Sequence, residues 1–187
     1  MRRAPPILLA VVSVAAGAAD LPKAVLVQLP SGYQVMVAQN GPDMEAGRKS
    51  YLAVLHRAGD SRDAPSPRPL VIFEQQADGR YRLSARNDDV VLRADEGGQC
   101  DPFDPDEAAD SGLAVKGRYF TVQNAVACGR HWRDDVTFRR DPHTHRWVFA
   151  NEIATESFPL EGKPDSVRVI RADVHRPVAF DAWRRKD

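Results

Sequence analysis

The residues with the greatest potential for chemistry are carboxylates, and they are concentrated in one segment. Positions 95–110 hold seven acidic side chains and no lysine or arginine. Closely spaced oxygen ligands can bind a divalent cation such as calcium, an acidic surface can attract a basic protein partner, and the same composition is also typical of a solvated loop. The residues that we consider for binding a cation or a partner are Asp101, Asp104, Asp106, Glu107 and Asp110.

A second group of candidates lies further along the chain. His131 together with Asp134 or Asp135 can form a general acid–base pair, the chemistry that a hydrolase of envelope polymers needs. That interpretation requires a concave site where at least two residues of a small set converge, namely His131, Asp134, Asp135 and Glu152. The chain has no Gly-x-Ser-x-Gly, no phosphate-binding glycine loop and no His-Glu-x-x-His. We therefore assign no catalytic residue and favour a non-enzymatic role, with the hydrolase as the alternative.

The two cysteines of the chain, Cys100 and Cys128, are predicted to form a disulfide bond. An even number of cysteines in an exported chain favours pairing. The bond would close a loop of about 29 residues, worth about 3.5 kcal/mol in the chain-entropy model. The alternative is a reactive Cys128 thiol beside His131, which would leave Cys100 unpaired.

The N-terminus has the pattern of an export signal. Arg2 and Arg3 precede an apolar stretch at positions 7–16, which is too short to span a bilayer. Small residues at positions 15–19 then provide a cleavage site after Ala18 or Ala19. We therefore predict a signal peptide at 1–19 and a single β-rich domain at 20–187, located in the periplasm or secreted. No later stretch approaches the length of a membrane span.

The overall charge excludes one class of partner. The chain has 26 basic and 26 acidic residues and a formal net charge of zero. Proteins that bind phosphate backbones usually carry a positive excess, so a nucleic-acid partner is not expected. The hydrophobic share of 43% is sufficient for a folded core.

The pattern along the mature segment predicts a mainly β fold. A short amphipathic helix is expected at 20–29, and a period of two then predicts strands at 33–38, 51–56, 70–76, 80–86, 90–92, 113–126, 132–139, 146–151 and 167–171. Because short turns and no helices connect the strands, we predict an antiparallel meander sheet. Its core should contain Phe120, Val122, Val136, Phe138 and Val148 or its neighbours, and positions 178–183 should dock the C-terminus. The three tryptophans are interpreted as core or rim residues.

One segment resembles a known repeat family. Positions 33–55 read YQVMVAQNGPDMEAGRKSYLAVL, which is similar to the strand–loop–strand unit of FG-GAP/VCBS repeats found in small exported bacterial proteins. The family's loop binds calcium through alternating carboxylates, and the resemblance implies a β-hairpin here. The ligand positions depart from the family because Pro42, Met44, Ala46 and Ser50 replace oxygen donors. No calcium is therefore expected at this loop.

These observations together predict an exported, non-catalytic binding protein that acts on a protein partner in the cell envelope, in the manner of an inhibitor or an immunity protein. No cofactor is expected apart from calcium at the 95–110 loop. The alternatives are the hydrolase with His131 and Asp134 or Asp135, and a cation-binding structural module.

Overall fold

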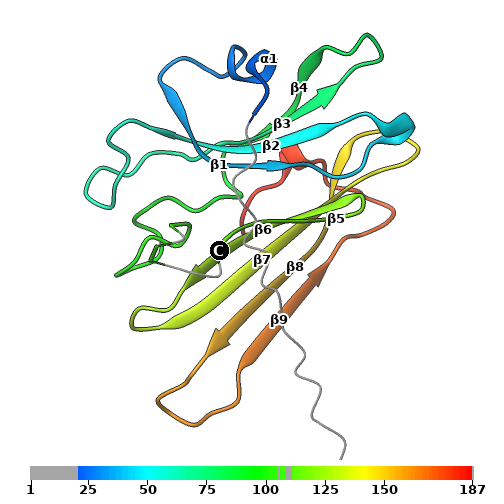
Figure 1. Ribbon diagram of the computed structural model, residues 1–187. Coiled ribbons are helices and arrows are strands. Elements are labelled where there is room, and N and C mark those ends of the chain that lie inside the picture. Colours follow the sequence, from blue (N-terminus) through cyan, green and yellow to red (C-terminus); the bar gives the residue numbers. More distant parts are fainter. Residues whose placement is uncertain (1–20, 105, 108–110, 187) are drawn as a thin grey trace, which may run out of the picture.

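The computed structural model describes residues 21–104, 106–107 and 111–186, and two antiparallel sheets dominate it (Figure 1). The first sheet consists, in spatial order, of β1 (Tyr33–Asn40), β2 (Ser50–Arg57), β3 (Leu70–Gln75) and β4 (Tyr81–Asn87). The second consists of β5 (Gly112–Lys116), β6 (Tyr119–Val126), β7 (His131–Arg140), β8 (Trp147–Ser157) and β9 (Ser166–Arg171). Within each sheet every strand pairs with its neighbours in sequence, so the mainly β, antiparallel meander fold is confirmed. The predicted signal peptide lies outside the described residues.

Among the described residues one α-helix is present, α1 (Lys23–Leu26), and it packs on the outer face of the first sheet (Figure 1). Its buried residue Val25 contacts the apolar cluster on that face. The helix is shorter than the predicted 20–29 segment, because β-branched Val27 and then Pro30 do not favour its continuation. Pro22 occupies the N-cap position.

The main core lies between the two sheets and is rich in aromatic rings. Phe120, Val122, Val136 and Phe138 are fully buried, as predicted. The Phe138 ring lies 5.3 Å from Phe120 and 4.9 Å from Phe180, measured between centroids. The prediction also named Val148 or its neighbours, and the structure selects the neighbours: Trp147 and Phe149 belong to this cluster. Aromatic pairs at such distances add to the free energy gained from burial alone.

Three predicted strands differ from the structure. The 113–126 segment is a hairpin, since Gly117 takes a left-handed φ of 56° between β5 and β6. Residues 90–92 form no strand and belong to the connection between the two sheets. Strand β8 continues to Ser157, well beyond the predicted end at 151.

The connection between the sheets is anchored by a disulfide and by a buried ion-pair network. Cys100 and Cys128 form the predicted disulfide bond, with their Cα atoms 6.1 Å apart. Arg68 is 2% exposed and donates two hydrogen bonds to the Asp101 carboxylate, at 2.6 and 2.5 Å, and one to Asp60 at 2.7 Å. The acidic segment, residues 95–110, is therefore anchored at two adjacent residues, Cys100 and Asp101.

The C-terminal segment docks on the core, as predicted. The 3-10 helix Phe180–Ala182 and the following Trp183 bury two aromatic side chains. The Asn87 side-chain amide donates hydrogen bonds to the carbonyl oxygens of Phe180 and Trp183, at 2.5 and 2.9 Å. This docking fixes the direction of the next residues, 184–186. None of the helices within the described ranges has the length and apolar character of a membrane span.

Candidate functional site

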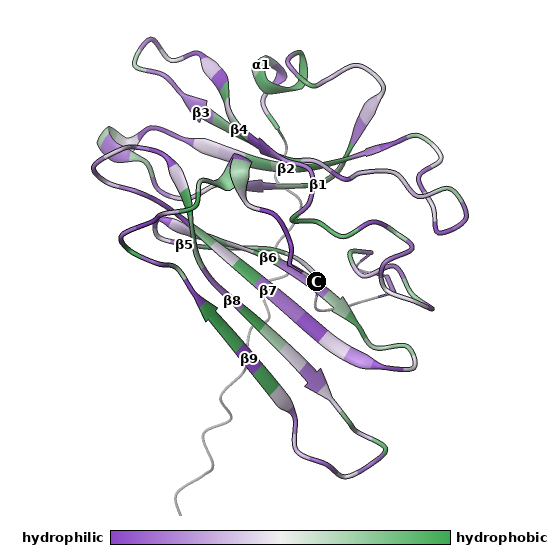
Figure 2. Ribbon diagram, turned by 180° about the vertical axis from the view of Figure 1, so that it is seen from behind, coloured by the Kyte–Doolittle hydropathy of each residue, from purple (hydrophilic) through white to green (hydrophobic). Residues whose placement is uncertain are grey.

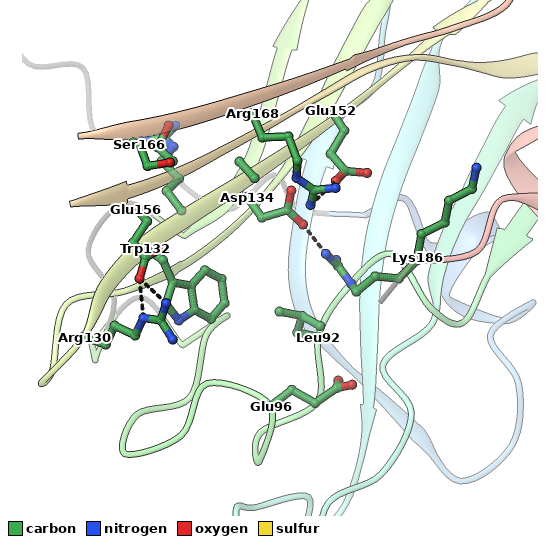
Figure 3. A pocket seen from close by; sticks show the side chains of 14 residues that line it. Leu92, Glu96, Arg130, Trp132, Asp134, Glu152, Glu156, Ser166, Arg168 and Lys186 are labelled. Carbon is green, nitrogen blue, oxygen red and sulfur yellow. Dashed lines mark hydrogen bonds and ion pairs between the residues drawn. The ribbon is translucent and has the colours of Figure 1, made fainter. Parts of the chain in front are cut away.

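A charged pocket lies on the inner face of the second sheet and is lined by residues of β7, β8 and β9 (Figure 3). Its volume is about 620 Å³. Strand residues form one wall, and the connection between the sheets and the C-terminal segment form the other. We call it the inner-face pocket; the residues that define it here are Trp132, Asp134, Glu152, Glu156, Arg168, Leu92, Glu96, Arg130, Arg185 and Lys186.

The two-residue period of β7 explains why Asp134 faces the pocket. Val136 and Phe138 point into the core, so residues 134 and 132 lie on the same face of the strand. Figure 2 shows part of β7 in purple, the colour of hydrophilic residues, next to a green apolar part of the same strand. The sheet register pairs Asp134 with Ala154 and Ala154 with Arg168, so Asp134 and Arg168 flank a small residue. The inner face thus changes from apolar to charged along one strand.

Ion pairs link the charged side chains of the pocket. Arg168 lies 3.3 Å from Glu152, and both Arg130 with Glu156 and Arg185 with Asp134 form close contacts (Figure 3). Glu152 is 7% exposed, and Asp134 is 6% exposed. Burial, and then the charge of Asp134, raise the pKa of Glu152 above its ordinary value, against the opposing effect of Arg168. The pocket therefore holds two buried carboxylates with different environments.

Trp132 provides the apolar part of the pocket. Trp147 and Trp183 are buried, while Trp132 is partly exposed and lines the cavity, so the three positions agree with the prediction of core or rim residues. An aromatic side chain surrounded by a few charged groups is typical of ligand sites. The sequence signal was the alternation of β7, which places Trp132 on the face of Asp134.

The structure brings together two of the four residues considered for acid–base chemistry. Asp134 and Glu152 share the inner-face pocket. Asp135 lies on the other face of β7, where Arg133 contacts it at 2.9 Å, and the same alternation directs His131 away from the pocket. The predicted pairing of His131 with Asp134 or Asp135 is therefore replaced by a pair of carboxylates.

The residues considered for cation or partner binding at 95–110 have separate environments. Asp101 is held by Arg68, and Glu107 accepts a hydrogen bond from the Asp101 amide at 2.7 Å. The Asp104 side chain accepts one from the Asp106 amide at 2.9 Å, while Asp110 lies outside the described residues. Within the described part of this chain, no three acidic, histidine or cysteine side chains are grouped as metal ligands would be.

The segment that resembles FG-GAP/VCBS repeats forms the hairpin of β1 and β2. Its loop is closed by Ser50, whose hydroxyl donates to the Pro42 carbonyl at 2.9 Å. A Cβ atom on Gly41 would lie 2.3 Å from the Ser50 hydroxyl oxygen, so this close approach requires glycine. The Ser50 hydroxyl therefore stabilises the turn between β1 and β2.

Comparison with protein families, curated proteins and solved structures gives no match. The likeness to FG-GAP/VCBS repeats therefore stays a prediction that depends on residues 33–55. Function has to be inferred from the inner-face pocket itself.

Proposed function

We propose that this is an extracytoplasmic, non-enzymatic binding protein that holds a segment of a protein partner in the inner-face pocket. The observation that carries the proposal is a cavity of about 620 Å³ in which Trp132 is surrounded by charged side chains of both signs. Tryptophan and arginine are enriched among the residues that dominate protein–protein affinity. An inhibitor or immunity-type protein would hold its partner in this way, and we propose that role for the pocket.

The edge strand β9 favours a polypeptide ligand over a small molecule. Ser166 and Arg168 of β9 line the pocket, and among the described residues β9 pairs with β8 alone. Its other edge offers backbone donors and acceptors that an extended peptide can use as an added strand. Val167 and Val169 are 59% and 43% exposed on the outer face, so such a strand would also cover apolar surface.

The location is supported by the covalent structure. A disulfide between Cys100 and Cys128 is stable in the periplasm and outside the cell, whereas the reducing cytoplasm disfavours it. This agrees with the export signal predicted at 1–19.

The test compares Trp132→Ala with Tyr119→Ala. Tyr119 is an aromatic residue on the opposite face of the same sheet and is 39% exposed, which makes it a matched control. An envelope protein is first captured from extract by immobilised wild type and by immobilised Tyr119→Ala. Because loss of a central aromatic contact costs about 2 kcal/mol or more, this protein should bind Trp132→Ala about 30-fold more weakly. Equal affinities for the two variants, measured by surface plasmon resonance, would contradict the proposal.

A second candidate function is favoured by the carboxylate pair. Asp134 and Glu152 lie in one pocket, and burial raises the pKa of Glu152, while Asp134 is paired with Arg185. Two carboxyl groups in different environments are the arrangement used for acid and base roles in glycoside hydrolysis. Glu152 would protonate the leaving oxygen and Asp134 would assist the attacking water.

This candidate predicts release of soluble fragments from dye-labelled peptidoglycan by the wild-type protein. Glu152→Gln should reduce the rate at least about 100-fold, because general acid catalysis contributes that much. Asp135→Asn, a carboxylate change on the other face of β7, should leave the rate unchanged. No release by the wild-type protein would exclude this substrate and leave the binding role.

A further inference from the structure

The protein's own C-terminal segment places a cation in the inner-face pocket. Arg185 donates a hydrogen bond to Asp134 Oδ2 and another to the carbonyl oxygen of Val90 at 3.2 Å. Its guanidinium carbon lies 5.7 Å from the centroid of the Trp183 ring. A carboxylate, a carbonyl and an aromatic ring are the partners with which proteins bind a guanidinium group.

Arg185 fills this subsite incompletely. Asp134 Oδ1 and Arg185 Nε are buried, and neither has a hydrogen-bond partner among the described residues. Arg68 and Asp101 of the same protein form a bidentate pair instead, with both carboxylate oxygens engaged. The backbone of Arg185 is constrained by Trp183, which is anchored in the core two residues earlier. A buried polar atom without a partner costs about 1–3 kcal/mol, so an arginine without this constraint can bind Asp134 better.

The fixed walls of the pocket are acidic, and the C-terminal segment supplies the compensating charge. Strands and connecting loops contribute four carboxylates that line the pocket, from Glu96, Asp134, Glu152 and Glu156. They contribute the guanidinium groups of Arg130 and Arg168. Arg133 also lines the pocket, but its guanidinium pairs with Asp135 at 2.9 Å and is therefore not counted against the four carboxylates. Arg185 and Lys186 therefore offset an excess of two negative charges. The acidic segment at 95–110 adjoins this pocket through Glu96 and would attract a basic partner.

We propose that the subsite at Asp134 binds an arginine side chain of the partner, and that Arg185 is a built-in competitor for that subsite. This inference depends on the proposed binding function. Exchange of one guanidinium for another keeps the Asp134 carboxylate compensated, so the buried charge is not left unpaired. Arg185 thus sets a threshold that weakly binding basic segments do not overcome.

The segment that carries Arg185 is held loosely beyond Trp183. Arg184 lies 2.9 Å from Asp89 in an ion pair whose side chains are 62% and 44% exposed. Exposed pairs of this kind contribute little, about 0–1 kcal/mol. Arg185 and Lys186 can therefore leave the pocket while Phe180 and Trp183 stay in the core.

The experiment uses the blocked peptide acetyl-Gly-Arg-Gly-amide, with its citrulline analogue as a neutral control. If Arg185 occupies the subsite for more than about 90% of the time, its removal raises the apparent affinity at least about tenfold. Isothermal titration should therefore show tighter binding of the arginine peptide to Arg185→Ala than to wild type. Arg184→Ala, the neighbouring change, should bind like wild type, and the citrulline peptide should not distinguish the proteins.

Asp134→Asn introduced into Arg185→Ala should abolish the gain, because the subsite then lacks its carboxylate. Equal affinity of wild type and Arg185→Ala for the arginine peptide, or a gain that survives Asp134→Asn, would overturn the inference. Arg185→Gln, which keeps most of the side-chain volume, repeats the measurement if the alanine variant does not fold.

The outcome separates this inference from the proposed function. A partner whose affinity depends on Trp132, combined with no effect of Arg185→Ala on the arginine peptide, refutes the built-in competitor and retains the binding pocket. If Trp132→Ala still binds both the envelope partner and the arginine peptide with unchanged affinity, the inner-face pocket is not the binding site.

Discussion

Replacement of Arg68 by alanine is expected to lower the free energy of unfolding by about 3–5 kcal/mol, the cost of removing one partner from a buried ion pair. Arg68 binds Asp101 through two hydrogen bonds and Asp60 through a third. The Asp60 side chain is fully buried, and that of Asp101 is 11% exposed. Without Arg68 both carboxylates lose their cation in a poorly solvated environment.

Urea unfolding followed by tryptophan fluorescence measures this effect. Arg80→Ala is the matched control, because Arg80 pairs with Asp78 at 3.6 Å but its side chain is 87% exposed. Exposed pairs contribute about 0–1 kcal/mol, so the control should unfold close to wild type. Similar unfolding midpoints for Arg68→Ala and Arg80→Ala would show that the buried network is not a major source of stability.

The same network predicts a pH dependence. Burial alone would raise the pKa of Asp60, but hydrogen bonds from Arg68 and Ser66 outweigh it, and the pKa lies below its ordinary value. A carboxyl whose pKa is lowered by folding stabilises the folded state above its unfolded pKa of 3.8. This contribution is lost as the pH falls from that value through the folded pKa, and the loss should be smaller in Arg68→Ala.

The strands were predictable because their signal is local. Alternation of apolar and polar residues predicted β7 and the strand segment that contains β6, and it correctly assigned Phe120, Val122, Val136 and Phe138 to the core. The turn at Gly79, with a φ of 82°, joins β3 and β4 where the sequence placed a hairpin. Such features depend on neighbouring residues and need no knowledge of the rest of the chain.

The division into two sheets was not predictable from that pattern. It depends on the connection between β4 and β5, in which distant contacts fix the position of residues 90–92. The buried amide of Asn124 donates to the Val90 carbonyl at 3.1 Å and its oxygen accepts from the Leu92 amide at 3.0 Å. These bonds use the backbone groups that a strand at 90–92 would have needed for a sheet.

The site was predictable in part. Extending the period of β7 from Val136 places Asp134 on the inner face, and Asp134 was among the residues considered. The inward direction of Glu152 does not follow from simple alternation along β8. The irregularity in β7–β8 pairing near Phe138 shifts that alternation by one residue. Phe149 and Glu152, three residues apart, consequently both face inward. Arg185 is 51 residues from Asp134 in sequence, and only the docking of Trp183 brings it there.

Replacement of both Cys100 and Cys128 by serine is expected to lower the free energy of unfolding by about 3.5 kcal/mol, the chain-entropy value for this loop length. The two cysteines are 28 positions apart, and the bond joins the acidic segment to the turn between β6 and β7. Urea unfolding with and without a reductant measures the loss in the wild type, and the double serine variant should match the reduced protein. Unchanged stability in both would contradict the prediction.

Hydrogen exchange of single amides in the double serine variant shows whether the disulfide holds the acidic segment locally or stabilises the whole protein. The Ala125 amide donates to the Pro102 carbonyl at 2.9 Å, so it reports on attachment of the acidic segment to β6. In the serine variant this amide should exchange with deuterium much faster, whereas the amide of Ala53, in the centre of the first sheet, should change only as far as global stability does. Because residues 100 and 101 hold the same segment, the Arg68→Ala and cysteine changes should be non-additive by about 0.5–3 kcal/mol. Full additivity would mean that the disulfide and the Arg68–Asp101 pair stabilise separate parts of the molecule.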